Sequence, residues 1–156
     1  MYIWYELKIQ RMLKKILKIL IVVLVIIQFY RPQKNISTEV AATDFLVVAK
    51  ADDTIASIIK NSCYDCHSNN TQYPWYAEVA PLSWWIAYHV DEAKEELNFS
   101  EWSTFSEKRK NKKLKEIVEE LEEREMPLKT YLPMHPEAKL SDKQIVLLTT
   151  WIKSLN

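Results

Sequence analysis

Glycine is absent from the 156 residues of this chain, and only two residues are cysteine. Without glycine, the Gly-rich loops that bind phosphates and dinucleotides are excluded, and turns that need positive φ are expected at Asn or Asp. Two cysteines in a single motif cannot form a multi-disulfide scaffold. No alternating apolar pattern typical of β-strands occurs, so we expect an all-α fold.

Positive and negative charges are distributed unevenly, although the formal net charge is zero. Residues 1–34 contain seven basic residues against the single acidic Glu6, which is +6 and leaves −6 for the other 122 residues. A mildly acidic body gives no reason to expect nucleic-acid binding. We therefore expect neither nucleic acid nor a nucleotide as a partner.

An apolar segment of 19 residues extends from Met12 to Tyr30, with its lysines confined to the first third. A helix needs about 20 residues to cross a bilayer, so we expect a single transmembrane helix at 12–30. No small-x-small cleavage site follows, which favours an uncleaved signal anchor over a removed signal peptide. The positive-inside rule places residues 1–11 in the cytoplasm as a basic tail and the rest of the chain in the periplasm, at the inner membrane.

Capping residues and helical periodicity predict four helices after this segment. They are expected at about 53–63, 84–97 and 106–125, and from 142 to near the C-terminus, where Ser141 and Gln144 form a capping box. Prolines at 127, 133 and 136 predict an extended loop before the last helix. Residues 31–51 are interpreted as a tether and residues 52–156 as the domain.

Residues 63–67 read Cys-Tyr-Asp-Cys-His, the C-x-x-C-H pattern of a c-type haem attachment site. Two thiols one helical turn apart can each form a thioether with a haem vinyl group, and the adjacent histidine can ligate the iron. The pattern predicts one covalent haem c, held by Cys63 and Cys66, with His67 as the proximal ligand.

Two other kinds of site are compatible with a cysteine pair. A thioredoxin-like dithiol normally begins a helix in a βαβ unit, whereas this pair ends a helix in an all-α chain. A structural zinc ion would need two ligands from His67, His89 and His135, which lack the paired spacing of zinc modules.

An electron carrier needs a second axial ligand, because an open position on the iron invites dioxygen, carbon monoxide or peroxide. Met126 is the first candidate, since it stands at a predicted helix end before a proline. Met134 and His135 lie on the same proline-rich loop, and His89 lies on the helix predicted at 84–97. Aromatic residues are expected to pack against the haem, with plain core packing as the alternative. These residues are Tyr73, Trp75, Trp84 and Trp85.

An amphipathic helix before the motif, Met-Pro 59 residues after His67, and a final helix after Leu-Ser-Asp that ends near Trp151 together resemble a class I cytochrome c. In place of the glycine that those proteins carry eight residues before the first haem cysteine, this chain has Ile55. More closely, an ordered set of motifs resembles the small bacterial haem-binding domain family. The set comprises Cys63–His67, Tyr73–Tyr76, Trp84-Trp85, His89, Leu97–Trp102, Met126-Pro127 and His135-Pro136. The resemblance extends over nearly the whole chain after Pro32 and includes the anchor. It implies a covalent haem and a membrane or periplasmic location.

The predicted function is one-electron transfer by a membrane-anchored, cytochrome c-like monohaem domain to or from a redox partner protein in the envelope. No Ser/His/Asp set and no carboxylate pair accompany the motif, so independent enzymatic turnover is not favoured. Two alternatives have an open sixth position on the iron. One is a haem-based gas or redox sensor, and the other is a peroxidase-like protein in which His89 or His135 is the distal acid–base group.

Overall fold

The computed structural model describes residues 2–37 and 40–155. Residues 1, 38, 39 and 156, which belong to the predicted tail, tether and domain, lie outside this description. The described residues form helices and no β-strand, apart from an isolated antiparallel bridge between Ile36 and Asn70. The predicted all-α class is confirmed. The chain divides into two compact units, residues 2–33 with 73–88 and residues 34–72 with 89–155, and the division falls within helix α5.

The first unit contains α1 (Tyr2–Ile27), the 3-10 helix η1 (Trp75–Glu78) and the start of α5 (Leu82–Glu96). Gln28 joins the end of α1 to Ala80, because its side-chain amide accepts from the Ala80 N–H at 2.9 Å and donates to the Ala80 carbonyl at 3.0 Å. The indole N–H of Trp84 donates to the Tyr30 carbonyl at 2.9 Å. These bonds connect two segments of this unit that are about fifty residues apart in sequence.

No helix in the described part of the chain is both long and apolar enough to cross a membrane, so the transmembrane helix predicted at 12–30 is not supported. Helix α1 has 26 residues and ends at Ile27, and four cations lie within its last 18 residues. They are Arg11, Lys14, Lys15 and Lys18. The unbroken apolar run from Ile19 to Ile27 extends only about 14 Å along a helix, which is less than half of a hydrocarbon core of about 30 Å.

In its described residues, the second unit contains the end of α5 and seven further elements, of which α3, α6 and α7 are the longest. The seven are α2 (Phe45–Val48), α3 (Asp53–Ser62), α4 (Tyr64–His67), η2 (Phe99–Thr104), α6 (Glu107–Glu122), η3 (Pro136–Ala138) and α7 (Asp142–Lys153). The four predicted helices are present as α3, α5, α6 and α7, with boundaries within three residues of those expected.

Side-chain caps define where these helices begin. The Asp52 carboxylate accepts from the Ile55 N–H at 2.9 Å at the start of α3, and Ser141 and Gln144 form the predicted capping box of α7. The prediction that Asn or Asp would replace glycine in tight turns is wrong for two helix ends. Lys50 (φ 51°) follows α2 and Arg124 (φ 59°) follows α6. At both helix ends, the N–H of the residue that follows donates to a carbonyl of the last helical turn at 3.0 Å. This is the Schellman pattern, which favours a residue in the left-handed conformation.

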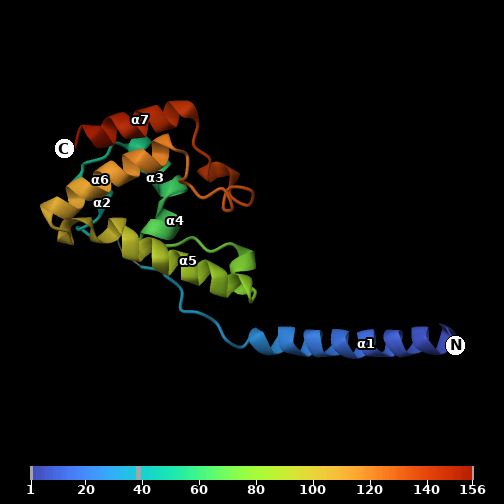
Figure 1. The fold of residues 1–156 in the computed structure, drawn as a ribbon. Helices are drawn as coiled ribbons and strands as arrows, with labels where there is room; N and C mark the ends of the chain where they lie inside the picture. Colours follow the sequence, from blue (N-terminus) through green and yellow to red (C-terminus); the bar gives the residue numbers. More distant parts are fainter. Residues whose placement is uncertain (1, 38–39, 156) are drawn as a thin grey trace. The chain divides into compact units, whose positions relative to one another are not determined.

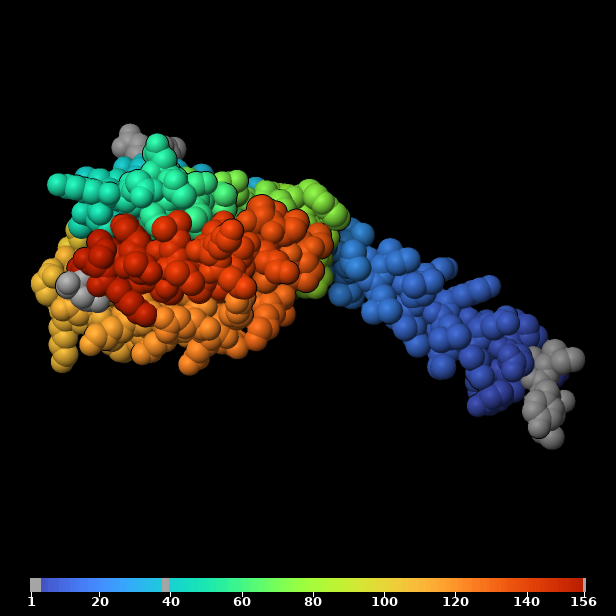
Figure 2. Space-filling model, turned by 90° about the horizontal axis from the view of Figure 1, so that it is seen from above, coloured from blue at the N-terminus to red at the C-terminus, as the bar shows by residue number. Residues whose placement is uncertain are grey.

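The core lies where α3, α6 and α7 meet. Helix α6 packs on α7, and α3 contacts α7, η3 and α4 (Figure 1). Viewed from above, α7 lies between α3 and α6 (Figure 2). The core residues are Phe45, Leu46, Ile55, Ile58, Ile59, Leu97, Phe99, Trp102, Leu114, Val118, Leu121, Leu140, Leu148 and Ile152. The apolar faces predicted for α3, α6 and α7 supply most of them.

Much of the segment interpreted as a tether packs within the second unit. Phe45 is only 1% exposed, and its ring contacts those of Phe99, Trp102 and Trp151. Asp44 caps α2 by accepting from the Leu46 N–H at 2.9 Å. Burial of a Phe-Leu pair removes apolar surface from water, which favours a packed segment over a free linker. The second compact unit therefore includes residues from Lys34 onward, ahead of the domain start predicted at residue 52, which stays a prediction.

Candidate haem-binding site

The Cys-Tyr-Asp-Cys-His motif forms one helical turn at the end of α3. Cys63 closes α3, because its N–H donates to the Ile59 carbonyl at 2.9 Å. Its own carbonyl accepts from the N–H groups of Cys66 at 3.2 Å and His67 at 2.9 Å. Both cysteines are half-buried free thiols. The backbone thus places them one turn apart, as thioether attachment to two vinyl groups requires.

The His67 ring is held by the C-terminal end of α5. Its Nδ1 lies 3.0 Å from the carbonyl oxygen of Ala93 and 3.0 Å from that of Leu97. Because a carbonyl oxygen can only accept, Nδ1 carries the proton and Nε2 keeps its lone pair. Metal-ligating histidines commonly donate their other ring N–H in this way. The residues present therefore fit a group that binds through Nε2 of His67.

His67 is neutral at pH 7. Burial lowers its pKa, and hydrogen bonds to the carbonyls of Leu97 and Ala93 raise it by less, while the positive charge of Lys113 lowers it further. The net direction is downward from a value already near 6.5. Only a neutral imidazole can ligate iron, so the burial that lowers the pKa also favours the ligating form.

The thiols are protonated at neutral pH. Burial raises the pKa of Cys63 to about 12, with a smaller contribution from Cys66. Burial likewise raises the pKa of Cys66 to about 11, aided by the negative charge of Asp65. A redox-active dithiol needs a lowered thiol pKa. This electrostatic environment disfavours the thioredoxin-like alternative.

The zinc alternative also lacks structural support. Among the described residues, no group of three or more His, Cys, Asp or Glu side chains is arranged to hold a metal ion.

Side chains from distant segments support the motif. The Tyr64 ring stacks on Phe99, with centroids 5.5 Å apart, and its hydroxyl donates to the buried Asp44 carboxylate at 2.7 Å. The Thr71 hydroxyl donates to the Asp65 carbonyl at 2.7 Å, and that of Ser68 donates to the Tyr64 carbonyl at 2.7 Å. The carbonyls at this short helix end are thus paired, as buried backbone groups require.

Asn35 ties the predicted tether to both the motif and α5. Its amide N–H₂ donates to the Ser68 carbonyl at 2.7 Å and to the Thr71 hydroxyl at 2.9 Å. Its amide oxygen accepts from Lys94 on α5 at 2.6 Å. Sequence reasoning missed Asn35, and no local pattern marks it.

The proline-rich loop reaches the motif through Tyr131. The Tyr131 hydroxyl donates to the Asp65 carboxylate at 2.7 Å, and the His135 ring stacks on Tyr131 with centroids 4.0 Å apart and planes 7° apart. His135 is buried, and its Nδ1 lies 3.1 Å from the Glu137 carboxylate. His135 is therefore separated from the motif by one side chain, that of Tyr131.

The other candidates for the second ligand lie in different settings. Met126 is half-buried just after α6, whereas Met134 is 59% exposed on the proline-rich loop. His89 lies on α5, with its Nδ1 4.0 Å from the Glu92 carboxylate. The assignment of Met126 as second ligand stays a prediction.

The four aromatic residues predicted to pack against haem all belong to the first unit. Trp75 is 77% exposed and Trp85 is 48% exposed. Trp84 contacts Tyr30 edge to face, with centroids 5.7 Å apart, and Tyr73 is half-buried. Their contact with haem stays a prediction. The structure instead places Phe99 at the motif, where its ring meets those of Tyr64 and His67.

Sequence reasoning also missed the role of the α5 terminus. The last carbonyls of a helix have no intrahelical donor and need one from outside. The predicted helix end near Leu97 was therefore a place to expect a donor, although the sequence does not say that His67 provides it.

Most of the chain, residues 22–154, matches the model of the haem-binding domain family. The chain belongs to this family. No curated protein and no solved structure is significantly similar to it. Membership confirms the resemblance to the haem-binding domain family and identifies the chain as a haem-binding domain, in agreement with the fit of His67 to an iron ligand. The likeness to class I cytochrome c stays a prediction. Covalent attachment, the number of haems and electron transfer stay predictions.

Proposed function

We propose that this haem-binding domain carries one covalent haem c and transfers single electrons in the bacterial envelope. The observation that carries the proposal is the His67 ring, with Nδ1 bonded to two carbonyls and two thiols in the same helical turn. Each thiol would add its S–H across one haem vinyl group, which forms a C–S bond and transfers the proton to the other vinyl carbon. The bound haem would supply the one-electron chemistry.

The protein's own residues have three tasks in this proposal. The carbonyls of Ala93 and Leu97 orient the imidazole and increase its basicity toward a metal. Phe99, 3% exposed, lies against His67 and keeps water from that side of the ring. Met126 would be the second ligand. His135 is the alternative favoured by a specific observation, its stacking on Tyr131.

The proposed location is the periplasmic side of the inner membrane, with a protein of the envelope as redox partner. Attachment of haem to C-x-x-C-H takes place outside the cytoplasm, which requires export of the domain. Helix α1 supports membrane contact, because its apolar residues from Met12 to Ile26 are exposed and Lys14, Lys15 and Lys18 accompany them. An exposed apolar helix with cations is suited to a lipid interface.

The decisive test is covalent attachment. The full chain, expressed with the c-type haem attachment machinery, should retain haem through denaturing electrophoresis and acidified acetone. The double variant Cys63→Ala/Cys66→Ala should lose it completely, whereas Cys63→Ala, with one thioether left, should retain some. If haem can be extracted from the unmutated protein, the domain binds haem non-covalently and the c-type assignment is refuted.

A further inference from the structure

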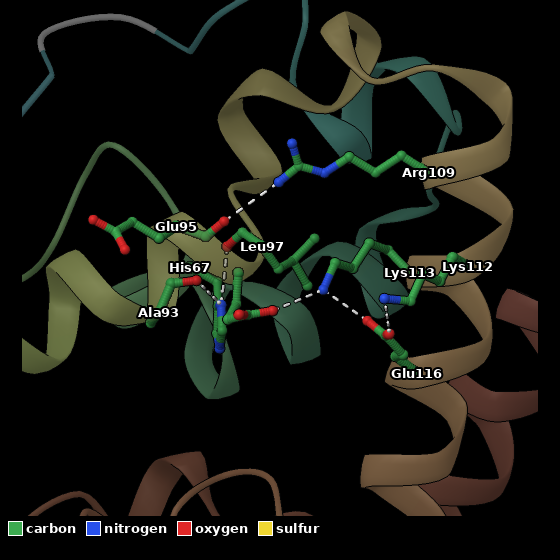
Figure 3. A network of polar contacts seen from close by, with 9 residues as sticks. His67, Ala93, Glu95, Leu97, Arg109, Lys112, Lys113 and Glu116 are labelled. Carbon is green, nitrogen blue, oxygen red and sulfur yellow. Dashed lines mark hydrogen bonds and ion pairs between the residues drawn. The ribbon is translucent and has the colours of Figure 1, made fainter.

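Helix α6 contacts the part of α5 whose carbonyls bond to His67. The Arg109 guanidinium donates to the Glu95 carbonyl at 3.3 Å, and the Lys113 ammonium donates to the Glu96 carboxylate at 3.1 Å (Figure 3). Both contacts fall between Ala93 and Leu97, whose carbonyls accept from His67 Nδ1. The last turn of α5 is thus bonded to α6 through Glu95 and Glu96, and the carbonyls at either end of that turn bond to the imidazole of His67.

Lys113 differs from the other lysines of α6. The residue is only 8% exposed, and it also pairs with Glu116 at 2.7 Å. A buried ammonium is costly to desolvate and needs well-placed partners. The neighbouring Lys112 contacts the same Glu116 at 3.1 Å, but its side chain is 72% exposed. Exposed pairs of that kind contribute little. Of these two adjacent lysines, only Lys113 makes a contact with α5.

We propose that Lys113 is a positioning residue for the axial histidine, which it fixes through Glu96 and the last turn of α5. This rests on the proposed ligation of haem iron by His67. Loss of the Lys113–Glu96 bond loosens the end of α5, where the Arg109 contact with the Glu95 carbonyl remains, so the two carbonyls hold Nδ1–H less firmly than at the observed 3.0 Å. Groups that hydrogen-bond a metal-ligating histidine tune both its orientation and its donor strength.

Three variants of the full chain separate positioning from simple electrostatics. Lys113→Met keeps much of the buried stem and removes the charge. Glu96→Gln weakens the same link from the exposed side, because a neutral amide oxygen replaces the carboxylate, and it leaves Lys113 paired with Glu116. This second variant tests the proposal even if Lys113→Met fails to fold. Lys112→Met is the matched control, because it removes the same charge one residue away.

The first measurement uses nitrogen-15 NMR on the protein with and without haem. It determines the tautomer of His67 and the exchange rate of its Nδ1 proton. Lys113→Met and Glu96→Gln should both accelerate exchange about tenfold or more, and Lys112→Met should leave it unchanged. Unchanged exchange in Glu96→Gln would overturn the proposal. If haem fails to attach while exchange in the haem-free chain responds as expected, the positioning stands and the proposed function fails.

The second measurement is the reduction potential of the haem-loaded protein. Lys113→Met removes a positive charge and Glu96→Gln removes a negative one, so a purely Coulombic effect would shift the potential in opposite directions. Weaker imidazole donation destabilises the oxidised iron and raises the potential in both variants. Shifts of opposite sign would overturn the positioning role.

Discussion

His67 is surrounded by groups that satisfy one ring nitrogen and leave the other available. The carbonyls of Ala93 in α5 and of Leu97 just after it accept from Nδ1 at 3.0 Å, and Phe99 meets the ring edge to face, with centroids 6.2 Å apart. Both contacts involve ordinary residue types that no motif singles out. The choice of ring nitrogen therefore follows from neighbours in space, although the histidine itself is recognisable in the C-x-x-C-H pattern.

The second ligand can be tested at the same scale. Methionine ligation raises the potential of a haem, so Met126→Ala should lower it on the order of 0.1 V, within the range of about 0.8 V that axial ligands cover. The substitution should also open the ferrous protein to carbon monoxide. Potentiometric titration and absorption spectra check both effects, with Met134→Ala, at an exposed residue, as the control that should change neither.

Other outcomes of this test have defined meanings. If His135→Ala, rather than Met126→Ala, opens the iron, the ligand is the buried histidine beside Tyr131 and the electron-carrier proposal survives. Rapid carbon monoxide binding by the unmutated ferrous protein would contradict electron transfer and favour the gas-binding or peroxidase-like alternatives.

Two helices have their C-terminal ends at the motif. Helix α3 delivers Cys63 at its C-terminus, and α5 presents its terminal carbonyls to His67. Helix termini are where backbone groups lack intrahelical partners, so they are natural places for contacts with side chains and ligands. The cap at the other end of α3 fixes where that helix begins, since Asp52 accepts from the Ile55 N–H at 2.9 Å.

Loss of this cap should destabilise the helix that carries the cysteines. Asp52→Ala should lower the free energy of unfolding by about 1 kcal/mol, the usual contribution of a side-chain N-cap. Asp53→Ala removes the same charge from the first turn without a cap and should have a smaller effect, about 0.5 kcal/mol. Urea denaturation of both variants measures the difference. An equal loss would mean that only the charge matters, not the cap hydrogen bond.

The whole molecule combines a unit with a well-packed aromatic core and a unit that contains an exposed apolar helix. In the second unit, Phe45 and Trp102 are buried together. In the first, the side chains of α1 from Trp4 to Ile26 are almost all exposed. Large exposed apolar surfaces on a protein mark places for a partner or a lipid surface.

Membrane contact through α1 predicts a dependence on its lysines. The full chain should bind vesicles that contain anionic lipid, and substitution of three lysines by glutamine should weaken binding about 100-fold, since each contributes about 1 kcal/mol. These lysines are Lys14, Lys15 and Lys18. The matched control replaces three exposed lysines of α6 and should bind normally. The control lysines are Lys108, Lys112 and Lys115. Sedimentation measures both, and equal loss in the two variants would argue against a role for α1.

The positions of the helices and the chemistry of the motif could be predicted because both depend on residues close together in sequence. The cap at Asp52 and the capping box of Ser141 and Gln144 act over three residues, and Cys63 and His67 lie within one turn. Propensity and periodicity describe interactions of that range. The sequence alone therefore determined the all-α class and the approximate helix boundaries, and it predicts the haem attachment residues.

The tertiary structure decided how these parts are held. The Tyr131–Asp65 bond joins residues 66 positions apart, Asn35 meets the Ser68 carbonyl 33 positions away, and Phe45 fills the core from a segment that looks like a linker. Which ring nitrogen of His67 keeps its lone pair likewise depends on carbonyls 26 and 30 residues later in the chain. Such contacts carry no local signature, because they form only when the packing of apolar faces brings distant segments together.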